Sequence, residues 1–366
     1  MRVIFVLQDN FDRNHGGMAV QMRNYLSGLS SLGLEVSRAN VTDFSKGITE
    51  EYDIVHLCDV SVSYDIPLLL RGIAKLDRSR TKVVLSTIYW DFDDYYRNGS
   101  YPLQRIIYKM FGSNLVDRLS SFAKFVRSGE IKFWRGVWTN RRALQKRVGD
   151  SVDLLLPNSA SEGDLFKELT GCSTPYQVIY NGLDINLRTS SSVKDIDVLC
   201  AARIDKRKNQ LQVAESFVNT DYKVVFAGPI GPHSAKYANE LLGIIKRNDN
   251  MKYLGSLEQN ELFDVYSRTR YHCLLSWVET PGLVNLEAFS CGAEVIVADK
   301  GSVRDYLGDA AHYVEIGDND DLLQILKEGR VRDIIHRNGL EDRIANKYNW
   351  NSIVQSLLEV YNDLIL

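Results

Sequence analysis

The sequence contains few cysteines, and none are spaced as a disulfide framework or a zinc site requires. Its five cysteines are odd in number and scattered, and no two form a Cys-x-x-Cys pair. Disulfide-rich domains and structural zinc sites both depend on closely spaced pairs of cysteines. We therefore expect no disulfide and no zinc, and a reducing compartment such as the cytoplasm.

Long apolar runs and the common nucleotide fingerprints are also missing. No stretch reaches the roughly 18 apolar residues that a membrane-spanning helix needs. The first apolar run, residues 3–7, is too short for the core of a signal peptide and predicts a strand instead. Neither G-x-G-x-x-G nor G-x-x-x-x-G-K-[ST] occurs, which argues against a dinucleotide fingerprint and a P-loop.

The composition is that of a globular enzyme with more than one core. The chain has 366 residues, 45% of them hydrophobic and 25% charged, which predicts two domains. The net charge is −3, but residues 97–147 hold twelve Lys and Arg against two acidic residues. This block carries +10 and the remainder −13, so we expect a localised anionic partner.

Strand and helix signals alternate along both halves of the chain, which is typical of open parallel sheets. The loop before the first helix carries Gly16 and Gly17, which would let a phosphate approach the backbone, although a plain turn is the better explanation of the pair on its own. Strands are expected over 1–7, 34–38, 53–57, 82–86, 152–156 and 176–180, and then over 197–201, 223–227, 251–254, 271–275, 294–298 and 311–314.

The stretch 276–297 is the most informative part of the sequence. Glu279 lies in the loop after a predicted strand, and Pro281 and Gly282 are expected to open a helix that contains Glu287. The free N–H groups at that helix start, including those of Leu283 and Val284, can bind an anion. A phosphate site flanked by two carboxylates suits a sugar nucleotide, whereas the simpler alternative is a loop carboxylate and a surface carboxylate.

A second cluster follows the strand predicted over 197–201. Residues 203–208 include four cations in six positions, at the strand end where a parallel sheet presents its ligands. Charge-assisted hydrogen bonds to phosphate are among the strongest that a protein makes. This cluster therefore predicts a phosphate clamp in preference to a solvated surface run.

Two features of the first half are weaker. His56 lies near a strand end, where a structural role is the more frequent one. The loop 87–96 is rich in aromatic and acidic residues and contains Asp91 and Asp93 as a D-x-D pair. A pair of this kind can bind a divalent cation, but stacking on sugar rings with Asp accepting hydroxyl protons is the preferred interpretation.

Residues 103–147 are predicted to be helical and combine cations with aromatic residues. Such a pattern is typical of a helix at an anionic membrane surface. The alternatives are a solvated basic face with its aromatic residues in the core, and RNA binding, which an acidic chain without an RNA-binding motif does not favour.

Taken together, these motifs resemble the retaining glycosyltransferases of family four over nearly the whole chain. The family's E-x7-E unit appears as Glu279 to Glu287, and its Arg-x4-Lys pair as Arg203 and Lys208. Its Gly-Gly loop, Asn-Ser helix start and domain-closing turn appear as residues 16–17, 158–159 and 178–184. The resemblance implies the GT-B fold, in which two Rossmann-like domains with parallel sheets face each other across a cleft. It also implies an amino-terminal acceptor-side domain of residues 1–184 plus 350–366 and a donor-binding domain of residues 185–349.

The resemblance also implies roles for individual residues. Arg203 and Lys208 would bind the donor diphosphate and stabilise the leaving group, while Glu287 would bind the ribose and Glu279 a hydroxyl of the transferred sugar. The backbone of Gly16, Gly17, Gly282, Leu283 and Val284 would form the rest of the donor-binding site. No metal and no cofactor are expected, because cationic side chains and backbone amides would take the place of the ion.

One departure from the family pattern concerns the acceptor side. The family usually has His-Asp after the strand at 82–86, where this chain has Tyr89 and, two residues later, Asp91. Tyr89 cannot replace an imidazole, so we expect Asp91 to keep the polar role.

The predicted function is transfer of a hexose from a nucleotide sugar to a lipid-linked or polysaccharide acceptor in surface glycan biosynthesis. The expected location is the cytoplasm, with peripheral attachment to the inner face of the membrane and without nucleic acid as a partner. The alternatives are a nucleotide-sugar epimerase of the same fold and a non-catalytic protein that binds sugar nucleotides.

Overall fold

The computed structural model describes residues 1–9, 11–13, 16–62, 64–138, 140–183, 191 and 193–366. The chain divides into two compact units. Unit 1 consists of residues 1–93, 102–182 and 350–366, and unit 2 of residues 94–101 and 183–349. Unit 2 thus includes a segment of eight residues from within the amino-terminal half, which the boundaries expected from the sequence do not contain. The expected boundary residue Asp184 lies outside the described residues.

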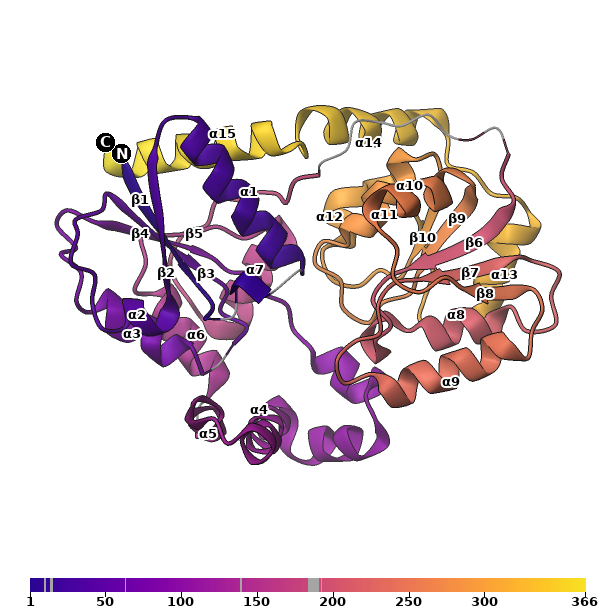
Figure 1. The fold of residues 1–366 in the computed structure, drawn as a ribbon, viewed down its shortest axis with the longest axis horizontal. Helices are drawn as coiled ribbons and strands as arrows, with labels where there is room; N and C mark the ends of the chain where they lie inside the picture. The colour runs from indigo at the N-terminus through magenta and orange to yellow at the C-terminus, as the bar shows by residue number, and fades with distance from the viewer. Residues whose placement is uncertain (10, 14–15, 63, 139, 184–190, 192) are drawn as a thin grey trace. The chain divides into compact units, whose positions relative to one another are not determined.

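Unit 1 is built on a parallel sheet of five strands in the order β2-β1-β3-β4-β5 (Figure 1). Alternate residues of each buried strand point to opposite faces, so both faces must be covered by helices. In β1, Val3 and Phe5 pack on one face and Ile4 and Val6 on the other. The strands are β1 (Arg2–Leu7), β2 (Glu35–Asn40), β3 (Ile54–Cys58), β4 (Lys82–Ser86) and β5 (Leu154–Leu155).

The helices of unit 1 cover the two faces of its sheet. Helices α1 and α15 pack together on one face, and α2, α3, α6 and α7 contribute to the core on the other. The close contact between α1 and α15 depends on Gly28, because a Cβ there would lie 2.6 Å from a methyl of Val354. The helical segments are η1 (Phe11–Arg13), α1 (Gly17–Ser31), α2 (Val41–Phe44), α3 (Ile66–Ile73), α4 (Pro102–Ser128), α5 (Ile131–Val137), α6 (Arg141–Gly149), α7 (Ala160–Thr170) and α15 (Trp350–Ile365).

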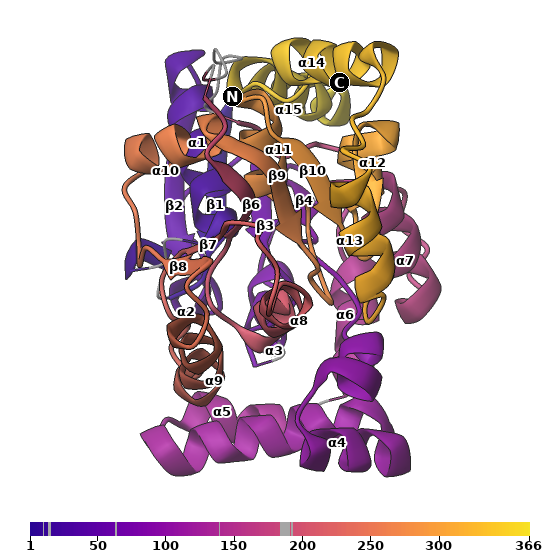
Figure 2. The same cartoon turned by 90° about the vertical axis from the view of Figure 1, so that its right-hand side faces the viewer.

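Helices α4 and α5 pack on each other and stand away from the sheet of their unit (Figures 1 and 2). Gly112 interrupts α4 with a φ of +73°, which a glycine adopts without steric cost. Many large apolar side chains of this helical pair are exposed. They are Leu103, Ile106, Met110, Phe111, Leu119, Phe122, Val126, Ile131 and Trp134, followed by Trp138 just after α5.

Unit 2 contains a parallel sheet of six strands in the order β11-β10-β9-β6-β7-β8. Its strands are β6 (Ile196–Ala201), β7 (Val224–Ala227), β8 (Met251–Tyr253), β9 (Thr269–Leu274), β10 (Glu294–Val297) and β11 (His312–Tyr313). Its helical segments are η2 (Tyr95–Gly99), η3 (Lys206–Lys208), α8 (Gln210–Ser216), α9 (Ala235–Lys246), α10 (Gln259–Ser267), α11 (Leu283–Ser290), α12 (Val303–Leu307), η4 (Gly308–Ala310), α13 (Asn319–Lys327) and α14 (Ile334–Asn346).

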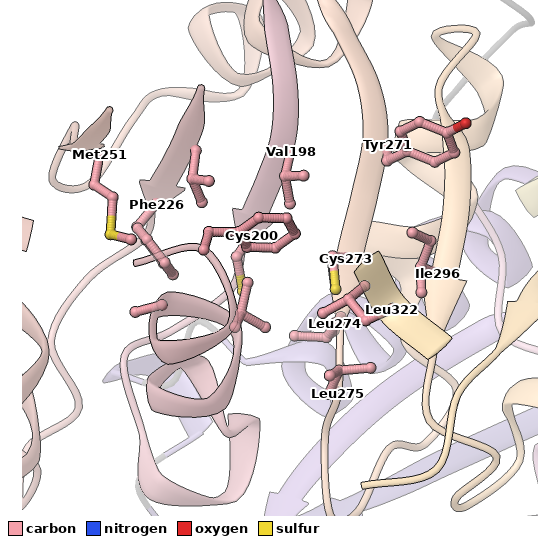
Figure 3. Packing of buried hydrophobic residues seen from close by; sticks show 14 of the residues in the cluster. Val198, Cys200, Phe226, Met251, Tyr271, Cys273, Leu274, Leu275, Ile296 and Leu322 are labelled. Atoms are coloured by element: carbon pink, nitrogen blue, oxygen red, sulfur yellow. The ribbon is translucent and has the colours of Figure 1, made fainter. Parts of the chain in front are cut away.

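The core of unit 2 lies between its sheet and helices α8, α9 and α13. Val198 and Cys200 from β6, Phe226 from β7 and Cys273 from β9 are fully buried there, and Leu322 of α13 packs against them (Figure 3). Because neighbouring parallel strands of this sheet all run the same way, the loops after β6, β7 and β9 emerge at one edge.

Two local features of the structure were not predicted from the sequence. Residues 176–180 form a single bridge, Tyr176 to Leu155, in place of a strand. The helix α14 was not expected, because its exposed Ile334 and Ile335 obscure the amphipathic pattern by which a surface helix is recognised.

Candidate active site

The candidate site of unit 2 is formed by two loops at the carboxyl edge of its sheet. The loop 203–208 follows β6, and the segment 275–282 follows β9, the strand that pairs directly with β6. The backbone N–H of Trp277 donates to the carbonyl oxygen of Arg207 at 2.8 Å, which joins the two loops. The sheet therefore brings together residues that are seventy or more positions apart in the chain.

The four cations of the first loop have different partners. The guanidinium of Arg207 donates two hydrogen bonds of 3.1 Å to Asp205, and the Lys206 ammonium lies 4.9 Å from the ring centre of Tyr101. Lys208 points to the second loop, and the side chain of Arg203 is 45% exposed, with its guanidinium 3.8 Å from Asp205. Two of the four cations are thus engaged within the loop and its surroundings, which leaves Arg203 and Lys208 as the better candidates to bind a ligand.

Lys208 and Glu279 form an ion pair with a distance of 2.5 Å between the ammonium and the carboxylate. Both side chains are largely buried, with exposed fractions of 20% and 10%. An ion pair in such a setting is oriented more strongly than one at the surface. The structure therefore brings two of the expected site residues into direct contact.

Two glycines allow the backbone around Glu279 to adopt its conformation. Gly301 has a φ of +74°, and a Cβ there would lie 1.9 Å from the carbonyl oxygen of Glu279. That same carbonyl accepts a hydrogen bond of 3.0 Å from the N–H of Ser302. Gly282 has a φ of +80°, and a Cβ there would lie 2.6 Å from the side chain of Glu279. Any larger residue at either position would displace Glu279.

Helix α11 begins later than expected. Gly282 is its N-cap and Leu283 its first residue, so Pro281 lies before the helix and the expectation that Pro281 and Gly282 open it is wrong. Backbone N–H groups of the first helical turn have no partner within the helix, and those of Leu283 and Val284 are in this turn. The N–H groups of Leu283 and Val284 thus come four and five residues after Glu279 in the chain.

A cavity of about 160 Å³ adjoins these groups. It is lined by Arg203 and Val284 together with the ends of β6 and β7, and Ser256 and Leu257 close it after β8. Its lining is mainly apolar apart from Arg203. A flat apolar group with an anionic extension would fit both the cavity and the adjacent cation.

Glu287 lies in the middle of α11 and is half-buried. Burial, together with the carboxylate of Glu287, raises the pKa of the Tyr266 hydroxyl well above its usual range. This places the Glu287 carboxylate beside Tyr266 of α10. The structure thus does not leave Glu287 as a fully solvated surface residue, which was the simpler alternative.

Two further polar residues of this site were not expected from the sequence. His272 and Asn285 are fully buried, and burial lowers the pKa of His272 to about 4. The Nε2 atom of His272 accepts from the N–H of Ala201 at 3.4 Å, and a Cβ on Gly282 would lie 2.7 Å from the Asn285 amide nitrogen. A neutral imidazole in the middle of a strand has no local sequence signal, so pattern analysis cannot find it.

In unit 1, Asp91 and Asp93 share one partner. The guanidinium of Arg142 lies 3.2 Å from Asp91 and 3.0 Å from Asp93. A cation between the two carboxylates takes the position that a metal ion would need, so the local geometry does not favour the D-x-D interpretation. Among the described residues, no three His, Cys, Asp or Glu side chains are grouped as metal ligands.

The residues around Asp91 are held by a buried carboxylate. Glu162 accepts hydrogen bonds from the Thr87 hydroxyl and from the N–H groups of Tyr89 and Asn158. The ring of Tyr89 is 1% exposed and packs edge-on against Phe166 at 5.2 Å. Tyr89 is therefore a core residue, which explains how this loop can lack a histidine without losing its structure.

Gly16 and Gly17 lie at the start of α1, where Gly16 is the N-cap and both residues are exposed. A Cβ on Gly17 would meet no atom within 4 Å, so packing does not require a glycine there.

His56, by contrast, is completely buried in unit 1. Its two ring nitrogens pair with the hydroxyls of Tyr361 and Ser86 at 2.5 and 2.7 Å, which indicates a structural role.

Comparison with known sequences identifies relatives of this chain. Residues 186–346, nearly all of which lie in unit 2, match the family described as glycosyl transferases group 1. The O-antigen chain mannosyltransferase B of Escherichia coli is 29% identical over 115 residues, which is 30% of each chain. A GDP-mannose-dependent monoacylated alpha-(1-6)-phosphatidylinositol monomannoside mannosyltransferase of Corynebacterium glutamicum is 24% identical over 261 residues. That match covers 62% of this chain and 66% of the relative, so the chain spans a third to two thirds of the length of these two proteins.

Comparison with solved structures extends to the whole chain. The sucrose-phosphate synthase of Thermosynechococcus elongatus superposes with a TM-score of 0.72 at 14% sequence identity, covering 100% of this chain and 99% of that one. At this identity the likeness concerns the fold, and it agrees with two α/β units that each carry a parallel sheet. Residues 186–346, which carry the candidate site, are thus similar to the glycosyl transferases group 1 family, and the chain as a whole has the GT-B fold.

Proposed function

We propose that this protein is a retaining glycosyltransferase of family four that moves a hexose from a nucleotide sugar to a lipid-linked or polysaccharide acceptor. The observation that carries the proposal is the Lys208–Glu279 ion pair, which joins the loop of Arg203 to the segment that leads into α11. The family match of residues 186–346 and the mannosyltransferase relatives support it.

In this proposal each group has a role in donor binding. The base occupies the cavity between the ends of β6 and β7, Glu287 binds the ribose, and Arg203, Lys208 and the N–H groups of Leu283 and Val284 bind the diphosphate. Glu279 accepts a hydrogen bond from a hydroxyl of the transferred sugar while it orients Lys208. In unit 1, the N–H groups at Gly16 and Gly17 bind phosphate, and Asp91 keeps the polar role on the acceptor side.

Departure of the nucleoside diphosphate develops negative charge, and preorganised donors aimed at that charge are the usual main source of rate. Two cations and two backbone amides supply such donors, so we propose that the reaction needs no metal ion. Chelation with EDTA should accordingly leave turnover unchanged.

The experiment that tests the function begins with thermal-shift measurements against UDP, GDP, ADP and their sugars. The nucleotide sugar that stabilises the protein is then incubated with glycan and lipid-linked acceptors, and the anomeric configuration of the product is read by NMR. Transfer with retention supports the proposal. Donor conversion without any acceptor indicates the epimerase alternative, and binding without turnover indicates a non-catalytic protein.

We further propose that α4 and α5 hold this protein at the cytoplasmic face of an anionic membrane. Four aromatic side chains of this region, Phe111, Phe122, Trp134 and Trp138, are exposed by 41% to 72%, so they do not belong to a buried core. Three of these and Phe125 form one cluster across both helices, with ring centres 5.3 to 6.5 Å apart. Exposed cations accompany them at Lys109, Lys124 and Arg127. No helix of the described chain is long and apolar enough to cross a bilayer.

Flotation with liposomes tests this location. The wild-type protein is expected to float with vesicles that contain phosphatidylglycerol and to be released by high salt, because screening weakens the attraction of each cation. Replacing Met110 and Phe111 together by serine should lower membrane binding by about tenfold or more, since each apolar side chain contributes roughly 1.5–3 kcal/mol when buried.

The matched control replaces Ile334 and Ile335 of α14 by serine, because these two neighbouring residues are as exposed as Met110 and Phe111. This control variant should bind vesicles like the wild type. Equal flotation of the wild type with neutral and anionic vesicles would remove the membrane proposal without affecting the proposed reaction.

A further inference from the structure

The segment Asp94–Tyr101, here called the strap, lies in unit 2 although the residues before and after it belong to unit 1. Most of it is the π-helical segment η2, and three of its residues, Tyr95, Gly99 and Ser100, are buried. The strap precedes α4 directly.

The strap contacts the loop that carries Glu279. Gly99 lies against the indole of Trp277, because a Cβ on Gly99 would be 2.6 Å from two ring atoms. Real Cβ atoms do not approach other atoms so closely, and an indole ring held by the backbone cannot easily move aside. Only glycine fits here, so the packing of the strap against Trp277 depends on Gly99.

The strap also contacts the loop that carries Lys208. The ring of Tyr101 lies 4.9 Å from the Lys206 ammonium, within the range of a cation–π interaction. Tyr95 is buried close to Asp205 and Arg207; burial, followed by the charge of Asp205, raises the pKa of its hydroxyl to about 12.

One end of the strap is fixed by an ion pair. The carboxylate of Asp94 lies 2.8 Å from the Lys300 ammonium, and Lys300 is the neighbour of Gly301, which packs on the carbonyl of Glu279. The strap therefore touches all three backbone segments that fix the Lys208–Glu279 pair: the loop 203–208, the segment around Trp277, and the turn at 300–301.

We infer that the strap is a positioning element of the donor site, which holds the loops of Lys208 and Glu279 in the arrangement that binds a nucleoside diphosphate. It acts through Trp277, Lys206 and Lys300 and does not itself contact the donor. This inference rests on the proposed function and adds to it residues that no donor-binding motif contains.

The test measures binding of UDP, GDP and ADP by calorimetry, and then the kinetic constants of transfer from the nucleotide sugar whose nucleotide binds. Gly99→Ala is expected to weaken nucleotide binding by about tenfold, which corresponds to about 1.4 kcal/mol. The KM for the donor should rise while the KM for the acceptor stays the same, which general loss of folded protein would not produce. The matched control is Gly243→Ala in α9, where a Cβ has an ordinary contact at 3.5 Å and binding should not change.

A second variant and a double variant complete the design. Tyr101→Ala removes the ring over Lys206 without adding any atom, so it cannot fail by overpacking, and it should weaken binding in the same direction. In a Trp277→Ala background, Gly99→Ala should have no further effect, because the clash partner is gone.

The outcomes separate the two claims. If the wild type binds none of UDP, GDP and ADP, the proposed function fails and this inference fails with it. If the wild type binds, but Gly99→Ala and Tyr101→Ala bind equally well, only the inference is overturned. A Gly99→Ala effect that persists undiminished without Trp277 would also overturn it.

Discussion

Lys208→Ala is expected to lower kcat by at least about a hundredfold, the typical cost of removing one preorganised donor from a developing charge. In this structure Lys208 is the cation of the 203–208 loop that reaches Glu279, whereas Arg207 pairs with Asp205 and Lys206 lies over aromatic rings. Lys206 and Arg207 therefore cannot replace it without giving up their own partners.

The matched control for this variant is Lys246→Ala, which removes an exposed lysine from the end of α9 in the same unit. It should keep the wild-type kcat. Activity of Lys208→Ala within a few fold of the wild type, with the same donor, would contradict the assignment of Lys208 to the diphosphate.

The free energy of unfolding of unit 1 is expected to fall on acidification because of His56. Burial lowers the pKa of its imidazole to about 3, whereas in the unfolded chain it titrates near 6.5. The unfolded state therefore binds a proton that the folded state does not, and the contribution to stability is complete above pH 6.5 and lost as the pH falls toward 3. At pH 5 the loss amounts to about 2 kcal/mol.

The variant His56→Gln isolates this contribution. Glutamine retains a donor and an acceptor for Tyr361 and Ser86 but cannot titrate, so the stability advantage of the wild type should shrink by about 2 kcal/mol between pH 8 and pH 5. Pulse-labelling hydrogen exchange along a urea series can read the peptides of unit 1 separately. An advantage of equal size at both pH values would show that the buried imidazole does not govern this part of the pH dependence.

The difference in the free energy of unfolding between the wild type and His56→Gln is the informative quantity, because other groups titrate in the same pH range. His272 in unit 2 behaves like His56, with its pKa lowered to about 4 by burial. Glu162 acts in the opposite direction: burial raises its pKa to about 7, so its contribution is present below its unfolded value and is lost as the pH rises through 7. The total slope of stability with pH mixes these contributions.

The local elements were predictable where one strong pattern governs a segment. The strand 82–86 has the bounds that its pattern indicates, because buried β-branched runs are encoded locally. The bridge at Tyr176 and the later start of α11 were not predictable, since they depend on packing against distant residues.

The same limit applies to the site. Arg203, Lys208, Glu279 and Glu287 are predicted by their resemblance to family motifs, and the loops that carry the first three lie at one edge of a parallel sheet. The roles of Gly99, Trp277 and Gly301 were not visible in the sequence. Each acts through one close contact with a residue far along the chain or through one backbone angle, and a single sequence carries no signal for either.

A structure of the protein with the bound nucleoside diphosphate of its preferred donor tests the central claim most directly. The account predicts the diphosphate within hydrogen-bonding distance of the Lys208 ammonium and of the N–H groups of Leu283 and Val284, with the base in the cavity beside Arg203. A diphosphate bound elsewhere on unit 2, with the Lys208–Glu279 pair and the start of α11 free of ligand, would contradict it.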